Sequence, residues 1–180
     1  MLTDRERQRA LDSLSKTRQT LLDAVDGVSD AQAQWKPAPD RWSIFEYVEH
    51  LAVSDGALIE LIERSLKSPA QPETEEERKQ REARIRATPI PRGANRAPET
   101  MQPHGRFASL SDAVSAFLSA REQSLEYARS TTDDLRSHFS PHPVLGPLDC
   151  YQWLMGNAHH VETHSGHIRE IRGLPGYPQS

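Results

Sequence analysis

Four long stretches of this sequence carry apolar side chains at roughly helical spacing, and proline or glycine breaks separate them. The spacing predicts helices over about residues 3–26, 44–66, 111–130 and 148–172, because apolar residues three to four positions apart share one helix face. No stretch shows the alternation of apolar and polar residues that is typical of a strand. The pattern therefore predicts an all-α chain that forms a four-helix bundle.

Several predicted helix ends carry recognisable signals. Thr3 is followed three residues later by Glu6, which is the pattern of a capping box, and Gly27 stands where the first helix should end. Two prolines break regular structure before the second helix. Trp35 and Trp42 flank these prolines and are expected to pack the end of the bundle.

Residues 69–106 differ in composition from the rest of the chain. Charge is dense there, prolines recur, and large apolar side chains are nearly absent. A short charged helix is predicted over about residues 75–86, most simply as a solvated surface helix. A lid over a functional site is the alternative, because so long a connection within one domain is usually functional or mobile. We expect residues 1–180 to form a single domain with this polar connection between its second and third helices.

Charge and cysteine content exclude several classes of protein. The net charge of −4 provides no basic field for phosphates, so no nucleic-acid partner is expected. Cys150 is the only cysteine, which excludes an intrachain disulfide and a thiolate-rich zinc site; a buried, inert thiol is expected. No apolar run approaches membrane-spanning length, and the charged N-terminus lacks the apolar core of a signal peptide. These features favour a cytoplasmic protein without a membrane partner.

The last predicted helix carries a stripe rich in histidine. At about 100° per residue, one side of the helix presents Trp153, Asn157, His160, His164, His167 and Ile171. The stripe begins and ends with large apolar residues, so it should face the core. His159 lies about 100° away and is expected to be exposed or to lie at an interface. Three core-facing histidines need an explanation, because an imidazole buried without partners is costly.

A metal ion would explain this stripe. His160 and His164 are one helical turn apart, so both imidazoles can reach one ion. A third ligand must come from another helix, and His50 is the only histidine inside the first three predicted helices. A buried hydrogen-bonded cluster without metal and a solvated polar face remain the alternatives. The histidines in proline-flanked loops are expected at the surface: His104, His138 and His142.

Three neutral imidazoles would leave coordination positions open, which is typical of a catalytic zinc site and not of a structural one. An ion with an open position can make water or a thiol nucleophilic near neutral pH. Imidazole ligands suit zinc, nickel, copper or iron, so the ligand type does not identify the metal.

Two segments resemble the DinB/YfiT-like superfamily. QWKPAPDRWSIFEYVEHL is similar to the start of that family's second helix, where W-S-x-x-E-x-x-x-H-L occurs. HHVETHSGHIREIRGLPGYP is similar to its last helix, where H-x-x-x-H-x-x-Q-I recurs. The resemblance implies an up-down-down-up four-helix bundle with a three-histidine metal site, whose positions fall on His50, His160 and His164. Residues 69–106 match no part of the family's pattern.

Two further candidate site residues come from the same motifs. Glu46 matches the family's glutamate and stands one turn before His50, so it could orient that histidine or act as a general base. The alternative is a helix-start glutamate or an exposed charge. His167 stands where the family has glutamine, so it could support the ligands, transfer a proton or be a fourth ligand. We predict that Glu46 or His167 handles the proton in catalysis.

The function expected from this resemblance is that of a metal-dependent enzyme. Activities in the family include low-molecular-weight thiol transfer and thiol-dependent isomerisation, other members are proposed hydrolases, and the fold does not choose among them. We expect a divalent zinc, nickel or iron ion to activate a thiol or water for attack on a small-molecule substrate, with a low-molecular-weight thiol as a candidate cofactor. The alternative is a non-catalytic, metal-stabilised bundle with a stress-associated interaction role. A homodimer is compatible with a bundle of this size.

Overall fold

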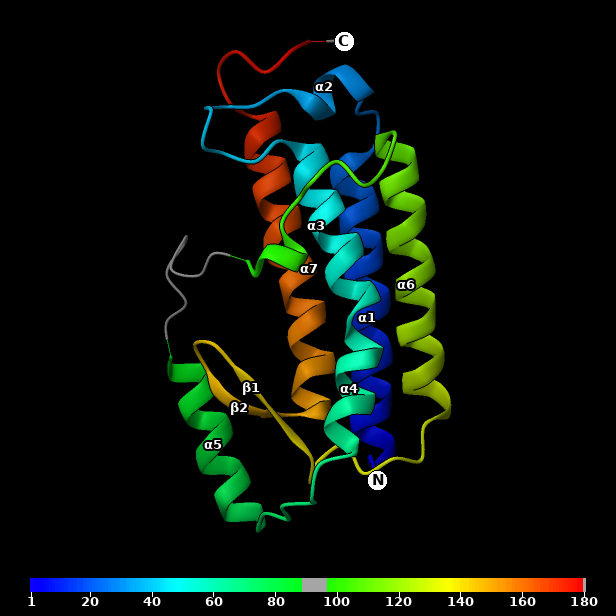
Figure 1. Cartoon of the computed structure of the whole chain (residues 1–180), viewed down its shortest axis with the longest axis vertical. Helices are drawn as coiled ribbons and strands as arrows, with labels where there is room; N and C mark the ends of the chain where they lie inside the picture. The colour runs from blue at the N-terminus through cyan, green and yellow to red at the C-terminus, as the bar shows by residue number, and fades with distance from the viewer. Residues whose placement is uncertain (89–96, 180) are drawn as a thin grey trace.

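The computed structural model describes residues 1–88 and 97–179, and its long axis is that of a four-helix bundle (Figure 1). The four rods are α1 (Asp4–Val25), α3 continued by α4 (Ile44–Gly56 and Leu58–Leu66), α6 (Leu110–Ser130) and α7 (Cys150–Arg172). Followed along the chain in Figure 1, they run up, down, down and up. The α1 and α3 helices each pack against both α6 and α7. The predicted four-helix bundle is confirmed.

Side-chain caps fix where the rods begin. Thr3 and Glu6 form the expected capping box at the start of α1. Asp149 caps α7 with Gln152 in the same reciprocal way. Such boxes satisfy backbone N–H groups that have no partner inside a helix. Gly27, with a φ of 68°, then turns the chain after α1, a conformation that L side chains rarely adopt.

The second rod is interrupted, and this differs from the single helix predicted over residues 44–66. The α3 helix ends at Gly56, and α4 starts at Leu58, with Ala57 between them. Ala57 keeps a right-handed helical conformation, with φ of −83° and ψ of −12°. The rod therefore changes little in direction, and apolar spacing alone carries no sign of such a short break. The short helix α2 (Asp30–Gln34) was also not predicted.

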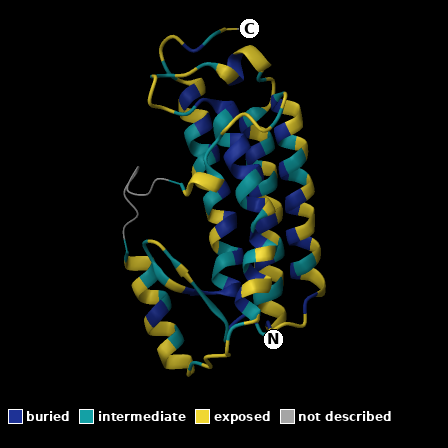
Figure 2. Ribbon diagram, viewed as in Figure 1, coloured by how far each residue is buried: buried dark blue, intermediate teal, exposed yellow. Residues whose placement is uncertain are grey.

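The core consists of two apolar clusters stacked along the bundle axis, and buried residues follow that axis in Figure 2. The first cluster includes Phe117, and the second includes Leu125. Arg121 lies one helical turn from each of them on α6, and its side chain is fully buried beside Asp55 of α3. A charged pair thus lies between the two apolar clusters.

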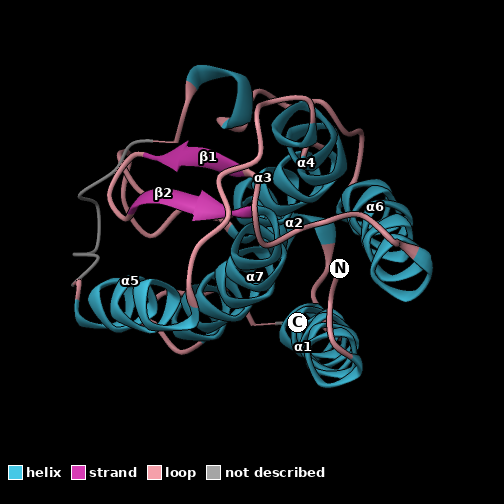
Figure 3. Cartoon of the chain, turned by 90° about the horizontal axis from the view of Figure 1, so that it is seen from below, coloured by secondary structure: helices cyan, strands magenta, loops and turns pink. Residues whose placement is uncertain are grey.

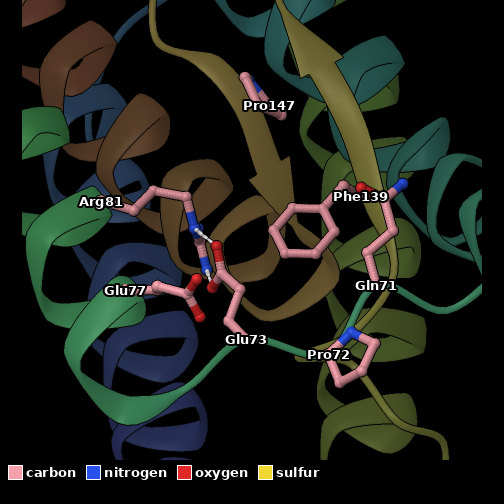
Figure 4. Close-up of a pocket in the computed structure, with 7 residues that line it drawn as sticks. All are labelled: Gln71, Pro72, Glu73, Glu77, Arg81, Phe139 and Pro147. Carbon is pink, nitrogen blue, oxygen red and sulfur yellow. Dashed lines mark hydrogen bonds and ion pairs between the residues drawn. The ribbon is translucent and has the colours of Figure 1, made fainter.

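The polar connection contributes a helix and a short 3-10 turn to the flank of the bundle. The helix α5 (Glu75–Ala87) matches the predicted charged helix, and Arg81 is its only buried residue. Figure 4 shows the guanidinium of Arg81 directed at the carboxylate of Glu73. Arg81 also bonds to Asp149 and Gln152 at the start of α7. The 3-10 turn η1 (Glu99–Met101) follows later in the connection.

A cavity of about 340 Å³ lies beside Arg81, between α5 and a β-hairpin (Figure 4). Its lining residues are Gln71, Pro72, Glu73, Glu77, Arg81, Phe139 and Pro147. None of the histidines on α7 lines it. The α5 helix therefore borders a cavity that contains none of the candidate ligands. This cavity gives no support to the alternative interpretation of α5 as a lid over the functional site.

The prediction of no strands is wrong, because the loop before α7 forms a two-stranded hairpin. Strand β1 (Phe139–His142) pairs antiparallel with β2 (Gly146–Asp149). Figure 3 shows the hairpin and α5 on the same side of the bundle, next to α7. Each strand is four residues long and contains a proline, and Pro141 pairs with Pro147. So short a pair does not produce detectable alternation, and a proline in the sequence argues against a strand.

Among the described helices, none is both long and apolar enough to cross a membrane.

Candidate metal centre

His50 lies on the inner side of α3 and is buried, with 5% of its surface exposed. The capping box of Ser43 and Glu46 sets the start of this helix. His50 follows Glu46 by one helical turn, and its ring faces α7. The Nδ1 atom of His50 lies 2.8 Å from the main-chain carbonyl oxygen of Met101. A carbonyl oxygen only accepts, so Nδ1 must carry the proton and donate it.

His160 and His164 face His50 from α7, one turn apart, and both are half-buried. Their ring centroids lie 4.4 Å from each other. The ring centroid of His50 lies 4.9 Å from that of His160 and 5.1 Å from that of His164. The structure therefore brings together the three histidines that the sequence predicted as ligands.

The Nε2 atoms of the three rings converge. His160 Nε2 lies 3.1 Å from His50 Nε2 and 2.9 Å from His164 Nε2. One potential ligand atom from each residue lies within 4.8 Å of the others. Nitrogen ligands of a tetrahedral ion lie roughly 3.3 Å apart when each bond is about 2.05 Å. The cluster is thus close to the spacing that a single ion requires.

Protons alone cannot satisfy this cluster when its rings are neutral. His50 donates through Nδ1, so its Nε2 presents a lone pair to His160. A ring nitrogen carries one proton or one lone pair, so His160 Nε2 can take part in only one of its two short contacts as an in-plane hydrogen bond. A cation that accepts a lone pair from each ring satisfies all three at once. The donor set therefore fits a divalent metal ion.

The electrostatics of the site favour neutral imidazoles. Burial, and then the neighbouring His50, lower the pKa of His160 to about 3. Burial, and then His160 and His50, lower the pKa of His164 well below its ordinary value. Burial also lowers the pKa of His50, against the opposing effect of its bond to Met101. Neutral rings are the form that binds a metal ion.

Aromatic rings and His167 surround the three histidines. The Trp42 ring centroid lies 5.0 Å from that of His50, and the Tyr47 centroid lies 5.2 Å from that of His164. Trp42 therefore borders the site, which was not expected from its prediction as a residue that packs the end of the bundle. His167 Nδ1 lies 3.3 Å from His164 Nδ1, the ring nitrogen that does not face the other two histidines. His167 is thus placed beside a ligand candidate and outside the converging Nε2 atoms.

Glu46 lies at the helix start, as the alternative interpretation expected. Its carboxylate accepts the backbone N–H of Ser43 at 2.7 Å and pairs with Lys36 Nζ at 2.9 Å. No bond from this carboxylate to the three histidines occurs among the described residues. The orienting partner of His50 is a backbone carbonyl, so the catalytic role of Glu46 stays a prediction.

Two features around the site could not be read from the sequence. Met101 belongs to the polar connection, and no residue type marks which backbone carbonyl will meet a histidine. Glu49, next to His50, is fully buried and accepts bonds from residues 104–106. Asn157, also buried, accepts a bond from Arg121 at 2.9 Å.

The remaining histidines lie apart from the converging atoms. His159 is exposed, as expected, with 75% of its side chain accessible. His104 is also exposed. His138 and His142 are half-buried, which corrects their prediction as solvated residues: His138 Nδ1 contacts the Ser68 carbonyl oxygen, and His142 accepts backbone bonds within the hairpin. His142 lies in the hairpin, which was not predicted.

Fold and site together define a class of protein, a four-helix bundle in which the second and last rods bring three histidines to one point. The chain belongs to the DinB superfamily, whose family model matches residues 13–168. This confirms the family resemblance of the two motif segments.

Individual relatives agree with this membership. The uncharacterized protein YuaE of Bacillus subtilis (strain 168) is 26% identical over 148 residues, which cover 82% of this chain and 88% of YuaE. YfiT from Bacillus subtilis, described as "a probable metal-dependent hydrolase with an unusual four-helix bundle topology", superposes with a TM-score of 0.63 at 18% identity, covering 96% of this chain and 89% of YfiT. A conserved protein from Enterococcus faecalis gives a TM-score of 0.60 at 13% identity, covering 91% and 95%. At these identities the two solved structures establish the fold alone.

Proposed function

We propose that this chain is a metal-dependent enzyme of the hydrolase type, in which His50, His160 and His164 hold one divalent ion. The observation that carries the proposal is the double contact of His160 Nε2, at 3.1 and 2.9 Å from two other ring nitrogens. Neutral rings cannot satisfy both contacts with protons, and a cation can. The description of YfiT as a probable metal-dependent hydrolase supports the same class of activity.

The protein's part in this chemistry is to present three lone pairs and an accessible side. The bound ion would supply Lewis-acid chemistry, which makes water nucleophilic near neutral pH. Burial keeps the three imidazoles neutral, so their lone pairs are available for the ion. His160 and His164 are only half-buried, so a small substrate can approach along α7.

His167 is the first candidate for a supporting role. When His164 binds the ion through Nε2, its Nδ1 carries the remaining proton and can donate to His167 Nδ1, 3.3 Å away. This bond would hold the His164 ring in place. For His167 to accept a proton during turnover, the bond would have to break, because Nδ1 holds the only lone pair of the neutral ring. Glu46 is the second candidate, and its carboxylate already accepts from the Ser43 N–H and pairs with Lys36.

Metal analysis of untagged protein tests the ligand assignment. The wild type is expected to carry about one divalent ion per chain, and the variants His50→Ala, His160→Ala and His164→Ala are expected to lose it. His159→Ala is the matched control, because this neighbour of His160 is exposed on the same helix. Stoichiometric metal in both His160→Ala and His164→Ala would show that the assignment is wrong.

Activity assays with the metal-loaded protein test the enzyme class. Hydrolysis of small ester or amide substrates that depends on metal and on His164 supports water as the nucleophile. Turnover only in the presence of a low-molecular-weight thiol would instead support a thiol transferase on the same ion. A bound ion that raises the melting temperature without turnover of any substrate would support the non-catalytic, metal-stabilised bundle.

A further inference from the structure

A short segment of the polar connection, residues 101–106, crosses α3 next to the histidine cluster, and we call it the clasp. The buried carboxylate of Glu49 holds it. The backbone N–H groups of His104, Gly105 and Arg106 donate to the Glu49 oxygens at 2.8, 3.0 and 3.1 Å. Glu49 has no exposed surface, so these bonds form away from solvent, where they are strong.

The side chain of Arg106 closes the clasp. Its Nη1 atom donates to Glu49 at 3.1 Å and to the Gln102 carbonyl oxygen at 2.6 Å. Its Nη2 atom donates to the Thr100 carbonyl oxygen at 3.0 Å. One guanidinium therefore links the carboxylate to the carbonyl groups on either side of Met101, so the conformation of the clasp depends on Glu49.

Met101 is the first residue of the clasp, and its carbonyl oxygen contacts the ring of His50. The two atoms, Met101 O and His50 Nδ1, are 2.8 Å apart. The bond that one ring nitrogen makes decides which form the other nitrogen takes. With Nδ1 protonated, His50 Nε2 is left with a lone pair directed at His160. An unbroken series of contacts thus leads from Glu49 through the clasp to the metal-facing atom of His50.

We infer that Glu49 is a positioning residue of the metal centre, which fixes the ring orientation and tautomer of His50 by holding the Met101 carbonyl in place. The inference rests on the proposed metal-binding function. Carboxylates and carbonyls that orient metal-bound histidines usually act by direct contact. Here the carboxylate acts through the backbone of residues 101–106, so the polar connection becomes part of the site.

Gly105 offers an independent way to disturb the clasp. Its φ of +71° lets the three successive N–H groups converge on one carboxylate, and a non-glycine residue is strained in this conformation. A Cβ atom at Gly105 would meet nothing within 4 Å, so Gly105→Ala changes only backbone preference. Gly27 is the matched control, with φ of +68° and the same free space, in the turn after α1.

The test compares wild type, Glu49→Gln, Gly105→Ala and Gly27→Ala by two measurements. Long-range ¹H–¹⁵N spectra of the metal-free, ¹⁵N-histidine-labelled protein report the tautomer of His50. Competition with a chromogenic chelator reports the affinity for Zn²⁺. Wild type and Gly27→Ala are expected to show the Nδ1–H form and the same affinity. Glu49→Gln and Gly105→Ala are expected to lose the single tautomer and to bind Zn²⁺ about tenfold more weakly or worse.

The outcomes separate this inference from the proposed function. Wild-type tautomer and Zn²⁺ affinity in both Glu49→Gln and Gly105→Ala would overturn the inference while leaving the metal site intact. An equal loss of affinity in Gly27→Ala would overturn it too, because general backbone strain would then explain the result. If Glu49→Gln does not fold, Gly105→Ala decides. If wild type binds no Zn²⁺, the metal-binding function is wrong, and the tautomer spectra still decide whether Glu49 positions His50.

Discussion

Arg121 and Asp55 form an ion pair inside the bundle: Arg121 Nη2 lies 2.7 Å from Asp55 Oδ2, and both side chains are fully buried. Burial acts to raise the pKa of Asp55, to about 6, against the opposing effect of the guanidinium. The same Nη2 donates to Asn157 Oδ1, three residues before His160. The pair therefore links α3, α6 and α7 just beyond the histidine cluster.

Breaking this pair on one side should be costly. We expect Arg121→Met or Asp55→Leu to lower the free energy of unfolding by about 3–5 kcal/mol, because each leaves an uncompensated buried charge. The double variant should be more stable than either single variant, since two apolar side chains need no partner. Urea denaturation followed by circular dichroism measures all four proteins. Losses that simply add in the double variant would show that the two charges are not coupled.

The stability of the metal-free protein should depend on pH through the histidine cluster. The pKa values of His50, His160 and His164 are lowered in the folded chain, mainly by burial, whereas in the unfolded chain they lie near their ordinary value of about 6.5. The unfolded state then binds more protons, so the free energy of unfolding should fall as the pH drops from about 7 to 5. Urea titrations at several pH values measure it. His160→Asn should flatten the dependence, and the exposed control His159→Asn should not; an unchanged slope in His160→Asn would contradict the prediction.

Cys150 should be inert in the folded protein. Burial, and then the charge of Asp149, raise the pKa of this thiol to about 11, and the residue has no exposed surface. Its Sγ donates to the His138 carbonyl oxygen at 3.4 Å. Because the thiolate is the nucleophile, alkylation by iodoacetamide at pH 8 should be on the order of 100-fold slower than in the urea-unfolded chain. Mass spectrometry over time gives both rates, and similar rates would refute the prediction.

Arg81 should hold α5 against the bundle. Its guanidinium lies 2.7 Å from Glu73 and 2.8 Å from Asp149. Removing hydrogen bonds between charged groups should raise local opening of residues 75–87 by about tenfold or more in Arg81→Ala. Hydrogen exchange of the α5 amides measures this opening, and Arg84→Ala, exposed on the same helix, is the control. If both variants exchange alike, Arg81 is not the anchor.

Much of the fold was predictable because the signals are local. The capping box of Thr3 and Glu6 and the apolar spacing that follows it place α1 to within a residue or two. The hairpin was not predictable, since Phe139–His142 and Gly146–Asp149 are stabilised by their place beside α7 and not by strand-forming residues. The break at Ala57 was equally invisible, because its backbone stays helical.

The sequence by itself determined the ligand candidates: helical periodicity puts His160 and His164 one turn apart, and only His50 remained as a third candidate in another predicted helix. Only the tertiary structure decided how these rings are used. It turned Glu46 to the helix cap, set His167 beside His164 Nδ1, and brought the Met101 carbonyl to His50 across 51 residues of chain. The physical reason is that side-chain periodicity is a property of one helix, whereas the orientation of an imidazole depends on a hydrogen bond to whichever segment packs against it.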